Sequence, residues 1–310
     1  MTFGPLNHGR LGYVRTGVRM SKFNLIVAIG ASLVAYLLPA APAQALFAQT
    51  FVSGIGLDSN DCATPATACH TFDHAIASTA NYGWVVCAGA VFDPPLITIN
   101  KPFMIDCTAS PANVLGITIN VAAGAIRLRN LRLNGLLQIA NGISILAAAN
   151  VIIEDCVIEN FTGFGINRSA GGRLLIRNTT IQNNSTGIGI FVGDTEIDNS
   201  RIDNNNNGIG AANTARVMVS RSVLSGHTSS ALILDPGGIA TVDGTTISSN
   251  STGITAPAGA TVVLSNNNIF LNTTAISGTT FSCRNNQIQI GGLGTPPTAL
   301  GSPQSLAGTM

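Results

Sequence analysis

The sequence predicts an all-β protein, a single-stranded right-handed parallel β-helix (solenoid) of about eight to nine coils with a short N-terminal cap helix. The first observation is a repeat of 21 to 26 residues between about residues 113 and 290, too short for a strand plus a crossover helix. The second is that three aliphatic columns recur in each repeat. The first column consists of Ile117, Ile143, Ile166, Ile188, Ile209, Leu232, Ile254 and Ile276.

The second and third aliphatic columns are separated by a constant five residues. The second consists of Leu128, Ile153, Ile176, Ile197, Val219, Val242, Leu264 and Cys283, and the third of Leu133, Ile158, Ile181, Ile202, Leu224, Ile247, Ile269 and Ile288. Polar residues alternate with these, so each repeat reads as three short strands with one buried face. Parallel strands connect with right-handed crossovers in roughly 98% of cases, which gives the coil its hand. Cys283 is expected to be buried.

The turn between the second and third columns is rich in asparagine. Two residues after the second column stand Asn130, Asp155, Asn178, Asn199, Arg221, Gly244, Asn266 and Asn285. So short an offset requires a tight bend with a left-handed residue, which Asn and Gly tolerate best. Stacked Asn side chains can also hydrogen-bond between coils. A second Asn column, at residues 184, 205, 250 and 272, marks the turn after the third strand.

These columns and the Asn-rich turn resemble the pectin-lyase-like superfamily of right-handed parallel β-helices and its asparagine ladder, over residues 50–290. The spacing of Thr50-Phe51-Val52-Ser53, a Gly-x-Asp-x-Asn motif and Cys62 to Cys69 is similar to secreted bacterial β-helix proteins of unassigned function. The superfamily includes lyases, hydrolases, phage tailspikes and non-enzymatic surface proteins. The resemblance therefore implies the fold rather than one activity.

Residues 1–45 are typical of a signal peptide. A basic region precedes an apolar stretch at 25–38 and a cleavage site at Ala43-Gln44-Ala45. Met20 is an alternative start, and a retained membrane anchor is the alternative interpretation of the apolar stretch. After cleavage the chain has 11 basic and 14 acidic residues and a single lysine, Lys101. We therefore expect no nucleic-acid partner, no membrane association after cleavage, and a secreted, periplasmic or cell-surface location.

The remaining chain divides into three segments. Residues 46–82 form an N-terminal cap of strand, loop and helix, with a helical apolar face at Phe72, Ala75, Ile76 and Thr79. Residues 83–290 form the β-helix, beginning with an irregular coil. Residues 291–310 carry no charge and include three prolines, which predicts a flexible C-terminal tail that blunts the last strand edge.

All six cysteines follow residue 45, which fits an oxidising compartment. Cys62 and Cys69 are predicted to close the cap loop as a disulfide. Cys87 and Cys107 are 20 residues apart, about one coil, and neighbouring strands bring Cα atoms within disulfide range. Cys156 has no evident partner. A metal held by Cys69, His70 and His74 is the alternative to the cap disulfide, but we expect neither a metal nor a cofactor.

One pair of carboxylates is spaced for glycosidase chemistry. Glu159 and Asp203 each follow the third column and lie two coils apart, about 9.6 Å, with Gln182 between them. Leaning side chains could reach the roughly 6.5–9.5 Å of an inverting glycosidase, and Arg201 could bind an anionic sugar. The alternative is a solvated strand face with ordinary charges. Glu196 and Asp198 form a weaker pair, and Glu154 with Asp198 could bind Ca²⁺ only if the protein is a lyase.

In the pectin-lyase-like superfamily the outward face of the first strand usually carries the catalytic acids. The corresponding residues here are all uncharged: Thr118, Ser144, Asn167, Gly189, Gly210, Ile233, Thr255 and Ser277. We therefore predict a non-catalytic exported β-solenoid that binds a polysaccharide or cell-surface glycan. The alternative is a polysaccharide lyase or glycoside hydrolase that uses Glu159, Asp203 and Arg201. Arg168 stands where neighbouring coils have an inward Ile, so the strand is expected to end there or to turn Arg168 to solvent.

Overall fold

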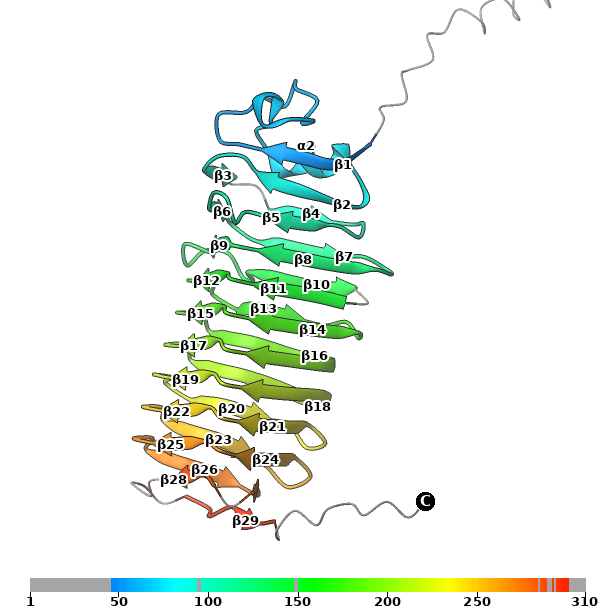
Figure 1. Cartoon of the computed structure of the whole chain (residues 1–310). Helices are drawn as coiled ribbons and strands as arrows, with labels where there is room; N and C mark the ends of the chain where they lie inside the picture. Colours follow the sequence, from blue (N-terminus) through cyan, green and yellow to red (C-terminus); the bar gives the residue numbers. More distant parts are fainter. Residues whose placement is uncertain are drawn as a thin grey trace, which may run out of the picture. The chain divides into compact units, whose positions relative to one another are not determined.

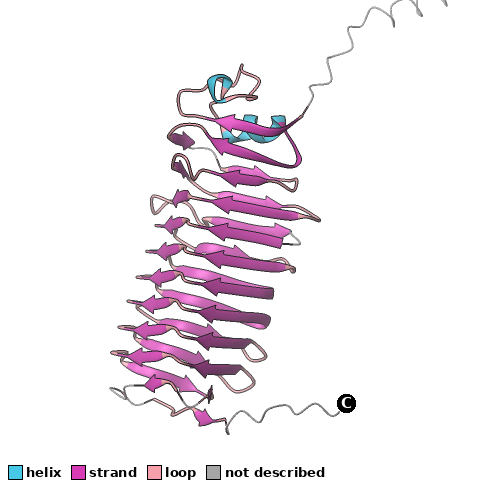
Figure 2. Cartoon of the chain, viewed as in Figure 1, coloured by secondary structure: helices cyan, strands magenta, loops and turns pink. Residues whose placement is uncertain are grey.

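The computed structural model describes residues 46–93, 96–147, 150–283, 285–288, 292 and 294–300. Strand β1 (Phe47–Val52), the 3-10 helix η1 (Pro65–Thr67) and helix α2 (Phe72–Ser78) form the cap at the N-terminal end of the stack (Figure 2). The hydroxyl of Thr71 caps α2 by accepting a hydrogen bond from the His74 amide. Phe72, Ala75 and Ile76 are buried, which confirms the predicted helical face.

Each coil contributes a first, a second and a third strand, and the coils stack along one axis (Figure 1). The first strands are β4 (Ile97–Ile99), β7 (Ile117–Asn120), β10 (Ile143–Ala147), β13 (Phe164–Arg168), β20 (Ser230–Leu234), β23 (Thr252–Ala256) and β26 (Thr274–Gly278). The second strands are β2 (Thr79–Cys87), β5 (Met104–Asp106), β8 (Ala125–Arg129), β11 (Asn150–Glu154), β14 (Arg173–Arg177), β21 (Ile239–Asp243), β24 (Thr261–Ser265), β27 (Phe281–Ser282) and β29 (Thr298–Ala299). In two coils one long strand supplies both: β16 (Thr186–Asp198) and β18 (Asn207–Ser220).

The third strands form a separate ten-stranded parallel sheet. They are β3 (Val91–Asp93), β6 (Ala112–Val114), β9 (Leu131–Asn134), β12 (Val157–Glu159), β15 (Thr180–Gln182), β17 (Arg201–Asp203), β19 (Val223–Ser225), β22 (Thr246–Ser248), β25 (Asn268–Phe270) and β28 (Gln287–Ile288). The first and second strands belong to a 19-stranded sheet that also includes β1. The protein is therefore a parallel β-solenoid, as predicted.

The strand register keeps each aliphatic column in line from coil to coil. In the first column, Ile166 is aligned with Ile143 and Ile188. Ile176 is aligned with Ile197 in the second column, and Ile181 with its neighbour in the third. Ile166, Ile176 and Ile181 are all fully buried in one common core. The predicted place of Cys283 in the second column is wrong: Ser282 rather than Cys283 is aligned with Leu264, and Cys283 is only half-buried at the end of the stack.

The turn from second to third strand has the predicted left-handed residue. The φ angles lie between 44° and 57° at Asn130, Asp155, Asn178, Asn199, Arg221, Gly244 and Asn266. The side chains also bond between coils as expected, with Asn199 Nδ2 donating to Asn178 Oδ1 at 2.7 Å. This turn makes the abrupt change of direction that a five-residue offset demands.

A buried polar column follows this turn, and the sequence patterns did not indicate it. Its side-chain oxygens accept hydrogen bonds from the backbone amide of the preceding coil, as Ser200 Oγ does from Thr179 at 3.2 Å and Ser222 Oγ from Ser200 at 3.1 Å. Cys156 occupies the same position, with Sγ 3.1 Å from Glu154 O. Burial raises the pKa of the Cys156 thiol to about 12, so this cysteine is a structural residue.

A second buried ladder follows the third strands, at the predicted Asn positions 184, 205, 250 and 272. Asn184 Nδ2 donates to Asn205 Oδ1 at 3.0 Å, and Asn250 Nδ2 to Asn272 Oδ1 at 2.8 Å. His227 takes the rung between Asn205 and Asn250. Its Nδ1 accepts from the Asn205 amide at 3.2 Å, but its buried Nε2 has no hydrogen-bond partner within the described part of the chain. Burial therefore lowers the pKa of His227, although hydrogen bonds to the backbone of Asn205 and Ile202 and the Asp203 carboxylate partly oppose this.

This histidine predicts a specific pH dependence. Below about pH 6.5 the unfolded chain binds more protons at residue 227 than the folded chain does, so the free energy of unfolding falls as the pH falls through this value. The His227→Asn variant should match the wild type within about 1 kcal/mol near pH 8, because Asn can bond as its ladder neighbours do. Near pH 5 it should be the more stable protein. Urea unfolding at both pH values measures the difference, and parallel pH profiles would contradict this account.

Arg168 corrects the prediction that the strand ends or that this side chain turns to solvent. Arg168 is 1% exposed and is aligned with the inward Ile145 and Ile190. Its guanidinium donates to the carbonyls of Ala170, Gly172 and Asp194 and, at 2.7 Å, to Thr195 Oγ1. Burial lowers its pKa to about 10, which leaves it charged at neutral pH. The aliphatic stem continues the core column, while the head satisfies turn carbonyls in two coils.

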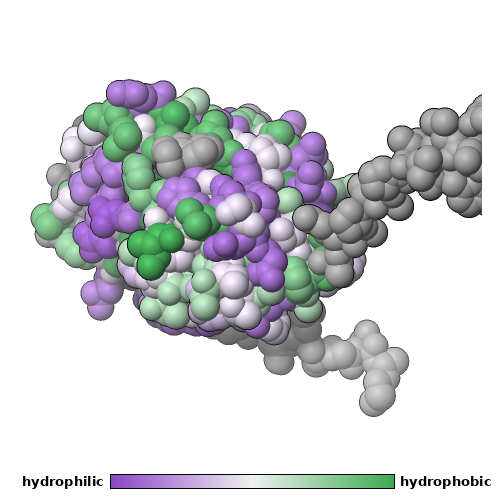
Figure 3. All heavy atoms as spheres, turned by 90° about the horizontal axis from the view of Figure 1, so that it is seen from above, coloured by the Kyte–Doolittle hydropathy of each residue, from purple (hydrophilic) through white to green (hydrophobic). Residues whose placement is uncertain are grey.

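The two ends of the stack are finished differently. At the N-terminal end, apolar residues form small separate groups among hydrophilic ones (Figure 3). At the C-terminal end, residues 294–300 of the predicted flexible tail cover the last coil. There the Thr295 amide donates to Ile276 O and the Thr298 amide to Thr280 O, both at 2.8 Å, and β29 extends the sheet by pairing with β27.

The predicted signal peptide at 1–45 and residues 301–310 lie outside the described residues. Within the described ranges, no helix has the length and hydropathy needed to span a membrane.

Candidate functional site

The predicted carboxylates Glu159 and Asp203 lie on the outer side of the third strands. Gln182 is aligned with both, so the three residues form one row across β12, β15 and β17. Both carboxylates are about 4% exposed. Glu159 Oε1 accepts from Arg132 Nε at 3.0 Å and from Asn134 Nδ2 at 3.3 Å, and Oε2 accepts from Gln182 Nε2 at 2.8 Å. Glu159 is therefore held by neighbouring side chains, among which Arg132 and Asn134 were not anticipated.

Arg201 is paired with Asp203, and its side chain is 56% exposed. Its Nε donates to Asp203 Oδ2 at 2.7 Å. The other oxygen, Oδ1, is buried and has no hydrogen-bond partner in the described ranges. The structure thus brings the three predicted residues onto one face, and their catalytic role remains a prediction.

The other carboxylates named from the sequence also have basic partners. Glu154 Oε2 lies 3.9 Å from Arg127 Nε and 3.8 Å from Arg129 Nε. Asp198 accepts from Arg221 Nη2 at 2.6 Å and from Ser220 Oγ at 2.8 Å. Glu196 accepts from Arg173 Nη2 at 2.6 Å. Ca²⁺ binding by Glu154 and Asp198 would require these pairs to be broken, since the cation needs several free oxygen ligands.

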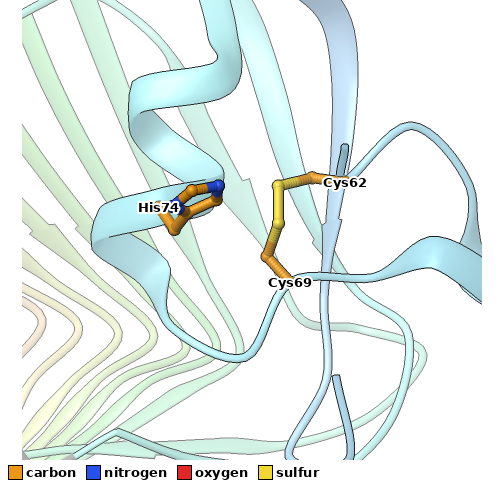
Figure 4. A group of neighbouring side chains, drawn as sticks. All are labelled: Cys62, Cys69 and His74. Atoms are coloured by element: carbon orange, nitrogen blue, oxygen red, sulfur yellow. A yellow bond between two sulfur atoms is a disulfide. The ribbon is translucent and has the colours of Figure 1, made fainter. Parts of the chain in front are cut away.

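The predicted disulfides are both present. Cys62–Cys69 joins Cα atoms 5.0 Å apart, and Cys87–Cys107 joins Cα atoms 4.7 Å apart on β2 and beside β5. The His74 ring lies beside the first disulfide, and its nitrogen is within 4.8 Å of the sulfurs (Figure 4). Because both sulfurs are bonded to each other, this group offers no thiolate to a metal.

A hollow of about 210 Å³ opens on the outer face of the first strands, which carry the predicted uncharged column. Its lining comes from β13, β16, β18 and β20 and consists of Phe164, Thr186, Gly189, Ile190, Phe191, Asn207, Gly210, Ala211, Ala212, Ile233 and Asp235. The Phe164 and Phe191 rings meet edge to face, with centroids 5.8 Å apart and planes at 77°. We call this hollow the first-strand groove.

Two glycines make the first-strand groove possible. Gly189 and Gly210 are aligned with each other and with Asn167 and Ile233 on either side. A Cβ on Gly189 would lie 2.5 Å from Phe164 Cε1, so the ring lies over this glycine. At Gly210 a Cβ would meet nothing closer than Ile233 Cγ2 at 3.9 Å, so the space above it is open. The aromatic wall of Phe164 and Phe191 therefore covers Gly189, and an open floor remains at Gly210, next to Ile233.

The first-strand groove combines apolar and aromatic walls with a few polar groups, the composition typical of small-ligand sites. Thr186, Asn207 and Asp235 supply a hydroxyl, an amide and a carboxylate. Sequence reasoning identified the uncharged column but missed the aromatic wall. The available signal was Phe191, an exposed aromatic residue two positions after a glycine of that column.

A search of curated protein sequences found no match. Among solved structures, the chain is similar to pectate lyase Pel9A with 14% identity and a TM-score of 0.48, over 81% of this chain and 76% of that one. It is also similar to the A-module of mannuronan C-5 epimerase AlgE4 from Azotobacter vinelandii, with 13% identity and a TM-score of 0.47, over 71% and 90%.

The family model described as "Right handed beta helix region" matches residues 100–235 and 141–292, more than half of the 310-residue chain. The matched region contains the three buried columns, both polar ladders and the first-strand groove. The chain belongs to the right-handed β-helix family.

Proposed function

We propose that this protein is an exported, non-catalytic β-helix protein that binds a polysaccharide in the first-strand groove. The groove itself carries the proposal. A sugar ring has an apolar C–H face and a rim of hydroxyls. Phe164, Phe191 and Ile233 offer apolar surface for the ring, while Thr186 and Asn207 offer hydrogen-bonding groups at its edge. The open floor at Gly210 lets a ring approach the backbone.

The charge of the first-strand groove favours a neutral or weakly charged saccharide. Asp235 is the one charged residue in its lining, and it is negative. A polyanion would meet this carboxylate without a basic residue from the lining to compensate it. We therefore expect neutral glycans to bind better than polyuronates.

The catalytic alternative has weaker support. A glycosidase acid must exchange a proton with the substrate, which requires an accessible carboxyl group. Glu159 is about 4% exposed, and both of its oxygens already accept hydrogen bonds. Arg201, predicted to bind an anionic sugar, donates from Nε to Asp203. These contacts suit a structural cluster that ties coils together.

Export is proposed on two grounds. Residues 1–45 have the composition of a signal peptide. The two disulfides suit an oxidising compartment, because thiols stay reduced in the cytosol. A polysaccharide of the cell envelope or of the surroundings is then the accessible partner. Detecting the chain, shortened after residue 45, in the periplasm or medium would test this part.

Gly210→Leu is expected to block the first-strand groove. The new side chain enters open space, so the fold should survive, while the floor becomes a ridge. Affinity for a neutral polysaccharide identified on a glycan array should fall at least about tenfold, or about 1.4 kcal/mol. Isothermal titration calorimetry with the corresponding hexasaccharide measures the change.

The matched control is Ser277→Leu, which places the same leucine side chain in the same outward column, aligned with Thr255 beyond the groove. It should bind as the wild type does. Equal loss in both variants would point to a general surface effect, and unchanged binding by Gly210→Leu would exclude this groove as the site.

A further inference from the structure

A second hollow, of about 390 Å³, lies on the outer face of the second strands. Strands β14, β16, β18 and β21 supply its lining. Its side chains include Arg173, Asp194, Glu196, Arg216, Met218 and Ile239. We call it the second-strand groove. Its volume falls in the range typical of small-ligand sites.

The second-strand groove has charged groups of both signs around an apolar surface. Arg173 is paired with Glu196 at 2.6 Å. Asp194 and Arg216 are aligned on neighbouring strands, yet among the described residues neither side chain has a hydrogen-bond or ion-pair partner. Met218 and Ile239 are 46% and 42% exposed and form the apolar part. Two arginines and two carboxylates leave the groove without net charge.

We propose that the second-strand groove is a second saccharide-binding site, for an uncharged sugar segment. The inference rests on the proposed function, because it assigns this groove the same class of ligand. A sugar hydroxyl both donates and accepts hydrogen bonds, so it can donate to Asp194 and accept from Arg216. The C–H face of the ring can then cover Met218 and Ile239. With two arginines and two carboxylates, the groove has no net charge to select an anion or a cation.

The two grooves lie on different faces of the same two coils, so one protein molecule would bind two glycan chains at once. Strands β16 and β18 contribute to both grooves: in β16, Gly189 and Phe191 line the first, and Asp194 and Glu196 the second. The buried core residues Ile188 and Ile197 of the same strand lie between the two outer faces. The two grooves open on different outer faces, so each can take a separate short oligosaccharide. Two occupied sites would therefore bridge two polymer chains and strengthen binding to a polysaccharide matrix.

The test uses a double variant, Met218→Ala with Arg216→Gln, which removes apolar surface and the unpaired guanidinium. The matched control is Met104→Ala with Arg127→Gln, the same changes on the same outer face and nearer the cap, outside the groove. Titration calorimetry with hexasaccharides of glucan, mannan and galactan type gives the number of sites. Turbidity with the matching polymers reports cross-linking.

We expect two hexasaccharides per wild-type or control chain and one per chain of the double variant, with turbidity lost in the latter. Gly210→Leu should also leave one site. A single site abolished by Gly210→Leu alone would overturn this inference and preserve the proposed function. A single site that is lost only in the double variant would support the second-strand groove and overturn the first-strand groove as the binding site. No binding of any probe overturns both, and polygalacturonate binding in this groove without neutral binding would overturn the assigned class.

Discussion

Replacing Arg168 with Met is expected to cost about 2–4 kcal/mol of unfolding free energy. Methionine keeps the length and apolar stem, so the core column stays filled. What is lost is the guanidinium that donates to the carbonyls of Ala170, Gly172 and Asp194 and to Thr195 Oγ1. The Thr195 hydroxyl is buried and would be left without this donor. Urea denaturation followed by circular dichroism measures the loss.

The matched control is Arg173→Met, the same substitution at an exposed side chain five residues away. Its pair with Glu196 lies at the surface, where such pairs contribute about 0 to 1 kcal/mol. Arg168→Lys should fall between wild type and Met, because lysine keeps the charge but lacks the planar fork of donors. A cost for Arg168→Met no greater than that of Arg173→Met would mean that water replaces the guanidinium, and the assigned role would be wrong.

The columns and turns of the fold could be predicted because the same residue types recur at the same positions in every repeat. Ile166, Ile176 and Ile181 occupy fixed offsets within their repeat, and stacking carries those offsets through the molecule. The left-handed turn residues were predictable for the same reason, since Asn178 and Asn199 recur at one position and few residues tolerate that backbone conformation.

The features that were missed depend on contacts between coils. Arg168 was expected to end its strand or to lie in solvent, because its own strand gives no sign of the carbonyls that surround it. These carbonyls belong to a turn and to the next coil. Cys283 was assigned to the second column from the repeat, but the last coil is shorter and aligns Ser282 with Leu264 instead. The first-strand groove arises because Gly189 leaves room for the Phe164 ring, which makes the surface hollow a property of two coils together.

Asn250→Leu is expected to be the most damaging change in the buried ladder beside the third strands. Asn250 Oδ1 accepts from the His227 amide at 2.9 Å, and Nδ2 donates to Leu224 O at 3.2 Å and Asn272 Oδ1 at 2.8 Å. Leucine has the same branched shape but is larger, so no space opens for water to replace these partners. A buried amide and carbonyl then lose hydrogen bonds at about 1–3 kcal/mol each, and the total should reach about 2–4 kcal/mol.

The loss at Asn250 should also spread along the stack, because each coil is stabilised by its neighbours. Hydrogen exchange of backbone amides should accelerate on both sides of the rung, in β19 and β22 as well as β25. Asn150→Leu provides the comparison: Asn150 is exposed at the start of β11, and the same change there should alter stability by no more than about 0.5 kcal/mol. If both variants lost the same stability, the ladder would be a consequence of stacking rather than a cause of it. A loss confined to Asn250→Leu would mean that this single row of amides holds the third-strand edge of the solenoid together.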